Sequence, residues 1–253
     1  MVVVTGGSRG IGRATALAFA REGAAVAICG RDREALDGVL HELAQLQIEA
    51  VTEVVDVADE TAVNAFASRV TAHFGRVDAV VANAGIAGPT KPMHQTSLEE
   101  WRECLAADLD SVFMTFKAFL PPMLEARSGA LIAISSMTGK RPLRGRTPYA
   151  AAKMGVIGLV RTLALEVGAS GITVNCVCPG AVAGPRVDAV IRNQAEVQGI
   201  SEESALRQFT DSSALGRLVR DEEVARACVF LASDGARAIT GEDLNVSAGT
   251  VMY

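Results

Sequence analysis

A tyrosine and a lysine four residues apart, Tyr149 and Lys153, are the side chains best suited to acid–base chemistry in this sequence. The chain has only two tyrosines, and the other is the C-terminal Tyr253. Residues i and i+4 share one face of a helix, so the phenol and the ammonium of "YAAAK" would lie side by side. A free phenol has a pKa of about 10, and a nearby ammonium favours its phenolate form. The spacing therefore indicates either an incidental surface pair or a tyrosine made more acidic by a lysine.

A glycine-rich stretch, "TGGSRGIG" at residues 5–12, is a candidate phosphate site. It follows a short apolar run and begins a helical pattern. Gly6 allows a tight turn, Gly10 lets a pyrophosphate approach the backbone, and Gly12 lets helix and strand pack closely. The spacing is G-x-x-x-G-x-G rather than the commoner G-x-G-x-x-G, so an ordinary strand–helix turn is the alternative.

Apolar runs that alternate with helical patterns must position these residues. The runs are continuous, as in strands buried on both faces, and lie at 2–5, 24–29, 50–56, 77–83, 130–136 and 172–178. Helical spacing covers residues 11–23, 32–47, 59–75, 98–125 and 149–169. The alternation predicts an α/β fold of the Rossmann type, with one doubly wound parallel sheet. We find no linker, so residues 1–253 are predicted to be a single domain in which a polar helical excursion, residues 185–216, is a substrate lid over the crevice.

Composition excludes several classes of protein. The formal charge of −5 and the pI near 5.3 argue against a nucleic-acid-binding surface. The apolar runs are too short to span a bilayer and the N-terminus has no signal-peptide pattern, so we expect a cytoplasmic protein. Five cysteines without paired spacing do not form a disulfide framework. Cys176 and Cys178 are expected to share one face of a buried strand, and no metal site is predicted.

Taken together, the motifs resemble the classical short-chain dehydrogenase/reductase family, in particular its 3-oxoacyl-ACP reductases. They are the glycine spacing, "NAG" at 83–85, the Tyr149–Lys153 pair and "PG" at 179–180, in the family's order along essentially the whole chain. The resemblance implies hydride transfer between nicotinamide C4 and a carbonyl carbon, with Tyr149 passing the proton. It also implies that Ser136 orients the carbonyl and that Lys153 holds the nicotinamide ribose. The cofactor-binding residues it implies are Gly6, Ser8, Arg9, Gly10, Ile11, Gly12, Arg31, Asp56, Val57, Asn83, Ala84, Gly85, Tyr149, Lys153, Pro179, Gly180 and Val182.

The end of the second predicted strand bears on the choice of cofactor. Relatives that prefer NAD carry an aspartate where this chain has Gly30, and Arg31 follows. A carboxylate there would bind the ribose diol and repel a 2′-phosphate, whereas a guanidinium suits a phosphate. Arg9 is a second cation within reach. The sequence therefore favours NADP(H), with NAD(H) as the alternative, and by resemblance Asp56 contacts the adenine amine.

The clearest departure from the family pattern is Asp108, at the position where relatives carry an asparagine that supports a proton relay. An ionised carboxylate accepts the same hydrogen bonds but donates none. We place Asp108 among the catalytic residues and expect it to slow the relay, or to pair with Lys153 and weaken its effect on Tyr149.

The segment 137–148 carries Lys140, Arg141, Arg144 and Arg146 without any acid. It is either a solvated or subunit-contact loop, or a site where Arg146 meets an anionic group of the substrate. The predicted function is an NAD(P)(H)-dependent oxidoreductase of ketones and secondary alcohols. A 3-oxoacyl-ACP/CoA reductase and a dehydrogenase of a small anionic hydroxy acid remain open, as does an impaired nucleotide-binding scaffold. Family analogy also implies a homotetramer, or a homodimer, through helices around 97–126 and 149–167.

Overall fold

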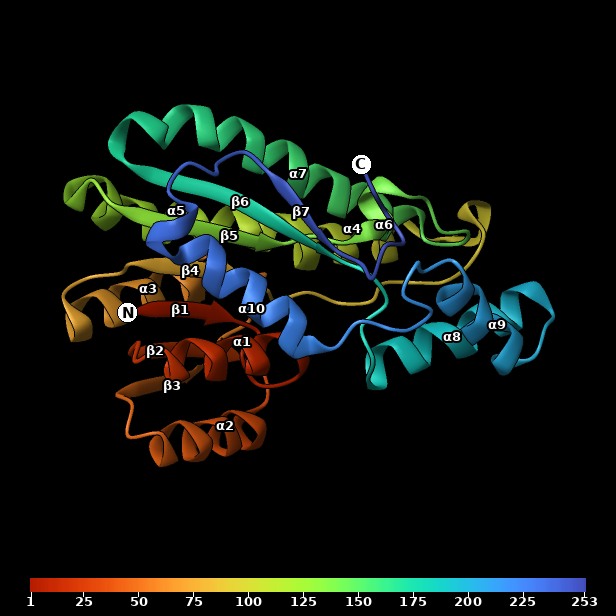
Figure 1. Cartoon of the computed structure of the whole chain (residues 1–253), viewed down its shortest axis with the longest axis horizontal. Coiled ribbons are helices and arrows are strands. Elements are labelled where there is room, and N and C mark those ends of the chain that lie inside the picture. The colour runs from red at the N-terminus through yellow and green to blue at the C-terminus, as the bar shows by residue number, and fades with distance from the viewer.

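Seven parallel strands form one sheet in the computed structural model, which describes all residues 1–253. Their order across the sheet is β3-β2-β1-β4-β5-β6-β7, and Figure 1 shows helices on both sides of it. The strands are β1 (Val2–Thr5), β2 (Val26–Gly30), β3 (Ala50–Val54), β4 (Ala79–Ala82), β5 (Gly129–Ile134), β6 (Ile172–Pro179) and β7 (Asp243–Val246). The predicted fold class is confirmed. Strand β7 was not predicted, because it has only four residues and two of them, Asp243 and Asn245, are polar.

The helices follow the predicted alternation, with three differences. They are α1 (Gly10–Arg21), α2 (Arg33–Gln45), α3 (Glu60–Phe74), α4 (Leu98–Leu105), α5 (Ser111–Ala126), α6 (Met137–Lys140), α7 (Thr147–Val167), α8 (Pro185–Gln198), α9 (Glu202–Asp211) and α10 (Asp221–Ala232). The predicted helix 98–125 is interrupted by a π-helical segment, Ala106–Asp110. We did not predict α6 or α10, although buried residues at helical spacing, Val224, Cys228 and Leu231, mark α10. None of these helices is both long enough and apolar enough to cross a membrane.

Two apolar cores fill the space between the sheet and its helical layers. One has 26 buried residues and joins α3, α5 and α7 to one face of the sheet, and it includes both Cys176 and Cys178. Those two side chains therefore share a face of β6, as predicted. The other core has 21 buried residues and joins α1, α2 and α10 to the opposite face. Since both faces are covered, the strands β1, β2, β4 and β5 are buried along almost their whole length.

The carboxyl edge of the sheet is where the candidate site lies. The strand order reverses between β1 and β4, so the chain leaves these neighbouring strands in opposite directions and a crevice opens between them. The glycine loop follows β1, and the "NAG" segment follows β4. Helices α8 and α9 lie beyond the same edge (Figure 1) and have a small core of their own: Val187, Ile191, Ala195 and Ala205.

Candidate active site

The glycine loop is packed so closely that one of its positions admits no side chain. A Cβ atom added to Gly12 would collide with the carbonyl oxygen of Gly6 and with the amide nitrogen of Asn83. Gly6 itself has φ +64°, a conformation that favours glycine. The first turn of α1 can therefore lie directly against the loop, as predicted for Gly12.

Asn83 holds this loop in place. Its side-chain nitrogen donates to the carbonyl oxygens of Thr5 and Gly6, at 2.9 and 3.1 Å. The Thr5 hydroxyl accepts in turn from the backbone N–H groups of Asn83 and Ala84. The first two residues of the "NAG" segment thus fasten the end of β4 to the end of β1, a role that the sequence did not indicate.

The start of α1 fits a diphosphate. Arg9 occupies the N-cap position, its side chain caps no N–H group, and the first turn contains no acidic residue. Gly10 has φ +51°, and a Cβ atom added there would meet nothing within 4 Å. Free N–H groups at a helix N-terminus, with open space in front of them, suit an anion. The loop residues Ser8 and Ile11 complete this turn between β1 and α1.

The two arginines predicted to bind a 2′-phosphate, Arg9 and Arg31, lie close to a carboxylate, that of Asp32. Gly30 ends β2, and Arg31, which follows it, is exposed. Arg9 reaches across to Asp32, and the two charges lie 2.5 Å apart in an exposed ion pair. Asp32 also caps α2 by accepting from the N–H of Ala35. The acid missing at Gly30 is thus present two residues later, where it is paired with one of the predicted phosphate ligands.

Asp56 and Val57 lie in the turn after β3, next in line along the same edge. The Asp56 carboxylate accepts from the N–H of Ala58 at 3.0 Å, and Val57 packs against the core of α3 and α5. Their predicted contacts with adenine stay predictions.

Lys153 is held by two partners at the centre of the site. Its ammonium donates to the carbonyl oxygen of Ile134 at 3.0 Å and lies 3.1 Å from Asp108 Oδ1. Its side chain is 5% exposed, and that of Asp108 is fully buried. The ammonium also lies 5.7 Å from the centre of the Tyr149 ring, since both residues follow one face of α7. The predicted pairing of Asp108 with Lys153 is therefore present.

Asp108, which reaches the lysine, lies in a π-helical segment. Segment Ala106–Asp110 separates α4 from α5, and its hydrogen bonds span five residues (i→i+5) instead of the four of an α-helix. Asp108 Oδ2 accepts from the Cys104 thiol at 3.6 Å, whereas Oδ1 has no aligned hydrogen bond despite its closeness to Lys153. Gly85 completes the enclosure, because a Cβ atom there would collide with Oδ1. Burial, together with the neighbouring Asp108 carboxylate, raises the pKa of Cys104 to about 12.

Arg146 lies in a different environment from the one predicted. It is 4% exposed, and its guanidinium carbon lies 4.6 Å from the centre of the Tyr149 ring. Its amino groups donate to the carbonyl oxygen of Ala87 and to the hydroxyl of Thr90. Burial lowers the pKa of this guanidinium. A contact with a substrate anion stays a prediction, but the observed donors face protein oxygens.

The serines at the end of β5 point in different directions, as the alternation of a strand predicts. Ser135 is buried and donates to the carbonyl oxygen of Lys153 at 2.7 Å, which ties β5 to α7. Ser136 caps α6 by accepting from the N–H of Thr138. The active-site prediction for Ser136 requires its hydroxyl to turn toward substrate, and its position at the end of β5, two residues after Ile134, is compatible with that.

The end of β6 forms the remaining wall of the cleft. Pro179 is its last residue, and a Cβ atom on Gly180 would lie 2.9 Å from the Cα of Ser247. Val182 forms an isolated parallel bridge with Val219. Arg186, in the first turn of α8, donates to the carbonyl oxygen of Gly85 at 2.6 Å. This contact draws α8 over the cleft and against the "NAG" segment.

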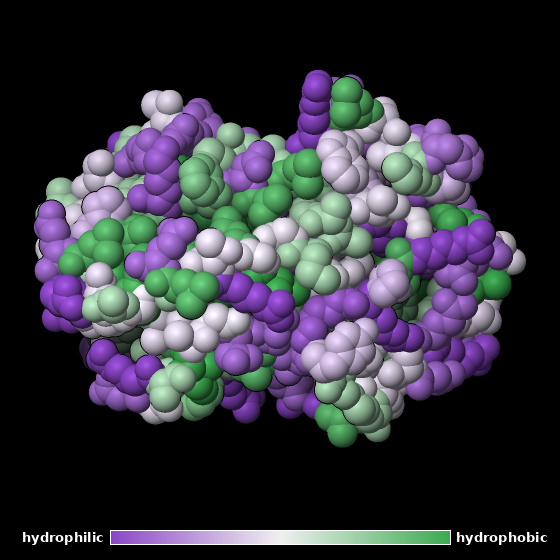
Figure 2. Space-filling model, turned by 90° about the horizontal axis from the view of Figure 1, so that it is seen from above, coloured by the Kyte–Doolittle hydropathy of each residue, from purple (hydrophilic) through white to green (hydrophobic).

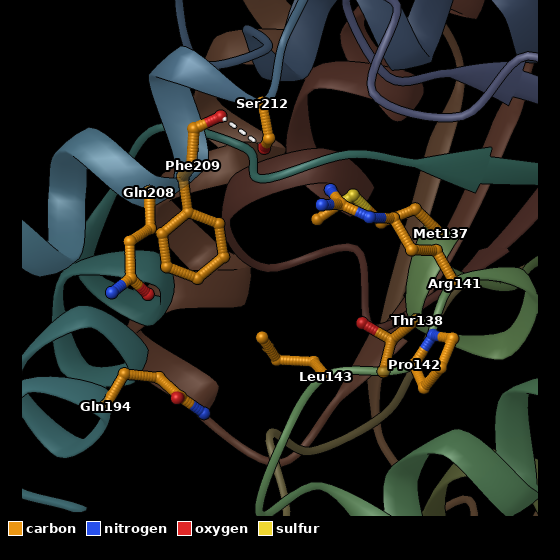
Figure 3. Close-up of a pocket in the computed structure, with 9 residues that line it drawn as sticks. All are labelled: Met137, Thr138, Arg141, Pro142, Leu143, Gln194, Gln208, Phe209 and Ser212. Carbon is orange, nitrogen blue, oxygen red and sulfur yellow. Dashed lines mark hydrogen bonds between the residues drawn. The ribbon is translucent and has the colours of Figure 1, made fainter. Parts of the chain in front are cut away.

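A pocket of about 120 Å³ opens between the segment that follows β5 and helices α8 and α9 (Figure 3). Arg141 is the only charged residue in its lining, and its side chain makes no hydrogen bond or ion pair in the structure. Gln194 donates to the carbonyl oxygen of Arg144, which joins α8 to this segment. The sequence grouped Arg141 with three other cations but did not single it out. The lining residues are Met137, Thr138, Arg141, Pro142, Leu143, Gln194, Gln208, Phe209 and Ser212.

Comparisons with known proteins agree with this architecture. Residues 6–251 match the family model described as "Enoyl-(Acyl carrier protein) reductase". The chain is 37% identical over 248 residues to the 3-oxoacyl-[acyl-carrier-protein] reductase FabG of Chlamydia trachomatis, covering 98% of this chain and 95% of that protein. It is 41% identical over 249 residues to cis-4-hydroxycyclohexanecarboxylate dehydrogenase of Sinomonas cyclohexanicum, with the same coverages. A crystal structure of a single-residue variant of actinorhodin polyketide ketoreductase with NADPH has a TM-score of 0.95, at 35% identity, over 100% of this chain and 97% of that one.

Proposed function

The chain belongs to the classical short-chain dehydrogenase/reductase family, and from this membership and the site we infer how it works as an NAD(P)(H)-dependent oxidoreductase of ketones and secondary alcohols. The bound nicotinamide cofactor would supply or accept the hydride. The observation that carries the assignment of roles is Lys153, buried beside Tyr149 and held by Ile134 and Asp108 at the mouth of the dinucleotide cleft.

The protein's own residues handle the proton and the orientation of the substrate. We propose that Tyr149 donates a proton to the developing alkoxide, or removes it from an alcohol, and that the Ser136 hydroxyl orients the oxygen. Lys153 holds the cofactor ribose and favours the phenolate form. Asp108 keeps the ammonium in place. The start of α1 and the glycine loop hold the diphosphate.

Tyr149→Phe tests this assignment directly, because it removes only the hydroxyl. We expect kcat/KM to fall by about 10²- to 10⁴-fold, the usual contribution of one general acid–base group. Cofactor binding should change little. The matched control is Tyr253→Phe, which alters the chain's only other tyrosine, an exposed residue. Full activity in Tyr149→Phe would refute the assignment, and a protein that binds cofactor but turns over no carbonyl in a broad panel would be a scaffold.

NADP(H) is our proposal for the preferred cofactor. It rests on Gly30, which has no carboxylate to repel a 2′-phosphate, and on Arg31, which is exposed and outside any ion pair of the structure. Arg9 contributes less, because Asp32 already pairs with it. We expect tighter binding of NADP(H) than of NAD(H), and expect Gly30→Asp to reverse the order. Calorimetric titration of both cofactors decides this, and tighter NAD(H) binding by the unaltered protein would overturn the proposal.

We further propose that the substrate carries an anionic group that reaches the pocket between 137–143 and α8–α9. Arg141 supports this, since it is an unpaired cation in a lining that contains no acid. One relative is named for a substrate with a carboxylate, cis-4-hydroxycyclohexanecarboxylate, and another for a 3-oxoacyl group on an acyl carrier protein. Lys140 does not contribute, because it is buried against Asp243.

A panel of substrates separates the two alternatives. Acetoacetyl-ACP and acetoacetyl-CoA represent 3-oxoacyl thioesters, cis-4-hydroxycyclohexanecarboxylate represents small hydroxy acids, and cyclohexanone is the neutral control. We expect Arg141→Ala to raise KM for the anionic substrates and to leave the neutral one unchanged. If Arg141→Ala changed KM equally for all four substrates, the proposal that Arg141 binds an anionic group of the substrate would be wrong.

The remaining parts of the proposal concern the lid, assembly and location. We propose that residues 1–253 act as one domain and that 185–216 is a lid, supported by the Arg186–Gly85 and Gln194–Arg144 contacts.

A homotetramer is supported by large apolar side chains left exposed on α5 and α7: Phe113, Met154 and Leu165, the last 88% exposed. Figure 2 shows hydrophobic residues gathered in patches on the side of the molecule that carries α7. Light scattering measures the mass of the assembly in solution and so tests the homotetramer. We also propose a cytoplasmic location.

A further inference from the structure

A buried arginine without a carboxylate partner lies against the ring of the proposed catalytic tyrosine. The Arg146 guanidinium is 4.6 Å from the ring centre of Tyr149, within the range of a cation–π contact. Its hydrogen bonds go only to neutral oxygens, those of Ala87 and Thr90, and its Nε has no partner at all. A guanidinium stays protonated in proteins. Its full charge therefore acts on its surroundings from inside the protein.

The second observation is that the carboxyl group of Asp108 lies against the ammonium of Lys153. The two groups are 3.1 Å apart and almost completely buried. A close ion pair in a poorly solvated place has a weak field at a third group, since the two contributions largely cancel. A lysine paired in this way acts on a neighbouring group more weakly than a lone lysine does.

We propose that Arg146 is a positioning residue that supplies the positive charge which Asp108 offsets. With Lys153, Asp108 and Arg146 all ionised, the three groups leave one net positive charge beside the phenol of Tyr149. This is the charge that an unpaired lysine would supply alone. The inference rests on the proposed role of Tyr149 and adds how its proton affinity is set in this chain.

Other groups that face this region do not supply the charge. Cys104, from α4, is a neutral thiol, because its pKa is raised to about 12. Arg186, from α8, is exposed and donates to the carbonyl oxygen of Gly85, so water screens it more strongly. Apart from Lys153, which is paired with Asp108, Arg146 is the cation that is both buried and close to the ring.

An anchoring role in the loop is the competing explanation, because Arg146 joins the start of α7 to residues 87–90. Such a role would require hydrogen bonds but no charge. Arg146→Gln retains an amide donor of reduced reach and removes the charge. Arg144→Gln is the matched control, since it makes the same change of net charge two residues away, on an exposed side chain.

The two tyrosines allow a test that needs no turnover. In full-length protein carrying Tyr253→Phe, Tyr149 is the only phenol, and its ionisation can be followed by the near-ultraviolet absorption of phenolate. We expect the midpoint to move to higher pH by about one unit in Arg146→Gln, the lower end of the range for a charge within reach. Asp108→Asn should move the midpoint to lower pH. With Arg146→Gln and Asp108→Asn together, the midpoint should be close to that of the protein carrying Tyr253→Phe alone. Arg144→Gln should leave it unchanged.

The kinetic arm is the pH dependence of kcat/KM for alcohol oxidation, whose acidic limb should move in the same directions. Arg146→Gln should then lose about tenfold of its rate on that limb, since one pH unit corresponds to a factor of ten. An Arg146→Gln midpoint equal to that of Arg144→Gln, in a folded protein, would overturn the proposal and leave a loop anchor. A midpoint shift in a protein without any turnover would support the charge effect while refuting the proposed function.

Discussion

The glycine loop and the group of charges beside Tyr149 form two walls of one cleft and are built in opposite ways. The loop is made of backbone packed so tightly that a single Cβ atom at Gly12 has no room, and Asn83 pairs with its carbonyl groups. The charged group consists of Lys153, Asp108 and Arg146. Two of its polar atoms, Asp108 Oδ1 and Arg146 Nε, are buried without a hydrogen bond.

This difference matches the roles proposed for the two walls, cofactor binding for the first and proton transfer for the second. A cofactor diphosphate needs fixed N–H groups and open space. Closely packed backbone supplies both without burying a charged side chain. Proton transfer needs charges whose balance sets an acidity, and buried charges act strongly because little water screens them. The first wall should therefore be sensitive to added volume, and the second to any change of one charge without its partner.

The largest expected effect follows from breaking the buried pair on one side. Lys153→Met leaves the Asp108 carboxylate buried without a counter-charge, so we expect the free energy of unfolding to fall by about 3–5 kcal/mol. Activity should also be lost. Urea unfolding followed by circular dichroism measures the change.

Two further variants sharpen this result. Adding Asp108→Leu to Lys153→Met removes both charges and should recover most of the lost stability. Lys117→Met breaks an exposed pair with Glu60 and should cost no more than about 1 kcal/mol. If Lys153→Met and Lys117→Met lowered the free energy of unfolding equally, the proposed difference between the buried pair and an exposed pair would be contradicted.

An intermediate effect is expected from volume added to the loop. Gly12→Ala forces α1 away from Gly6 and Asn83, and overpacking of this kind costs about 1–3 kcal/mol. Because the N–H groups at the start of α1 move with the helix, cofactor affinity should fall as well. Calorimetry of NADP(H) binding and thermal unfolding measure the two effects.

The control for this substitution is Gly38→Ala, in the middle of α2. A Cβ atom there meets nothing within 4 Å, so this variant should be more stable by about 0.5–1 kcal/mol, the ordinary helix preference for alanine. Unchanged cofactor binding in Gly12→Ala would show that the loop tolerates volume and would contradict the proposed contrast.

The smallest effect compares one thiol in each wall. Cys29 lies beneath the glycine loop and Cys104 beside Asp108, and burial raises the pKa of both to about 12. Only Cys104 has the Asp108 carboxylate as a second cause. Asp108→Asn should therefore increase alkylation of Cys104 by iodoacetamide at alkaline pH a few-fold and leave Cys29 unchanged, as peptide mass spectrometry would measure.

The same raised values set the direction of a stability change with pH. A thiol whose pKa is raised in the folded protein stabilises the folded state. This contribution is complete at pH values below the pKa of the thiol in the unfolded chain, which is near 9. That contribution is lost as pH rises from about 9 toward 12, because the unfolded chain ionises first. Stability that increased over this interval in the unaltered protein, but not in a Cys29→Ala, Cys104→Ala variant, would contradict the assignment.

Most of the fold could be predicted from the sequence, because its signals are local. Apolar runs buried on both faces identified six strands, and glycine spacing placed the loop between β1 and α1. The four-residue strand β7 could not be predicted, since it is defined by its pairing with β6 rather than by its own composition. The π-helical segment was also missed, because its residues have no helical pattern different from that of α4 and α5.

At the site, the sequence by itself determined which groups are present and which of them share a helix face. It established Tyr149 and Lys153 at i and i+4, Ser136 at the end of a strand, and a carboxylate at Asp108 in place of an amide. Only the tertiary structure decided where the charges lie. It buried Arg146 against the ring of Tyr149, paired Arg9 with Asp32, and left Arg141 unpaired in the pocket. The physical reason is that spacing along the chain specifies a side chain's direction from its own element, whereas its partners and its exposure to water depend on which other elements pack against it.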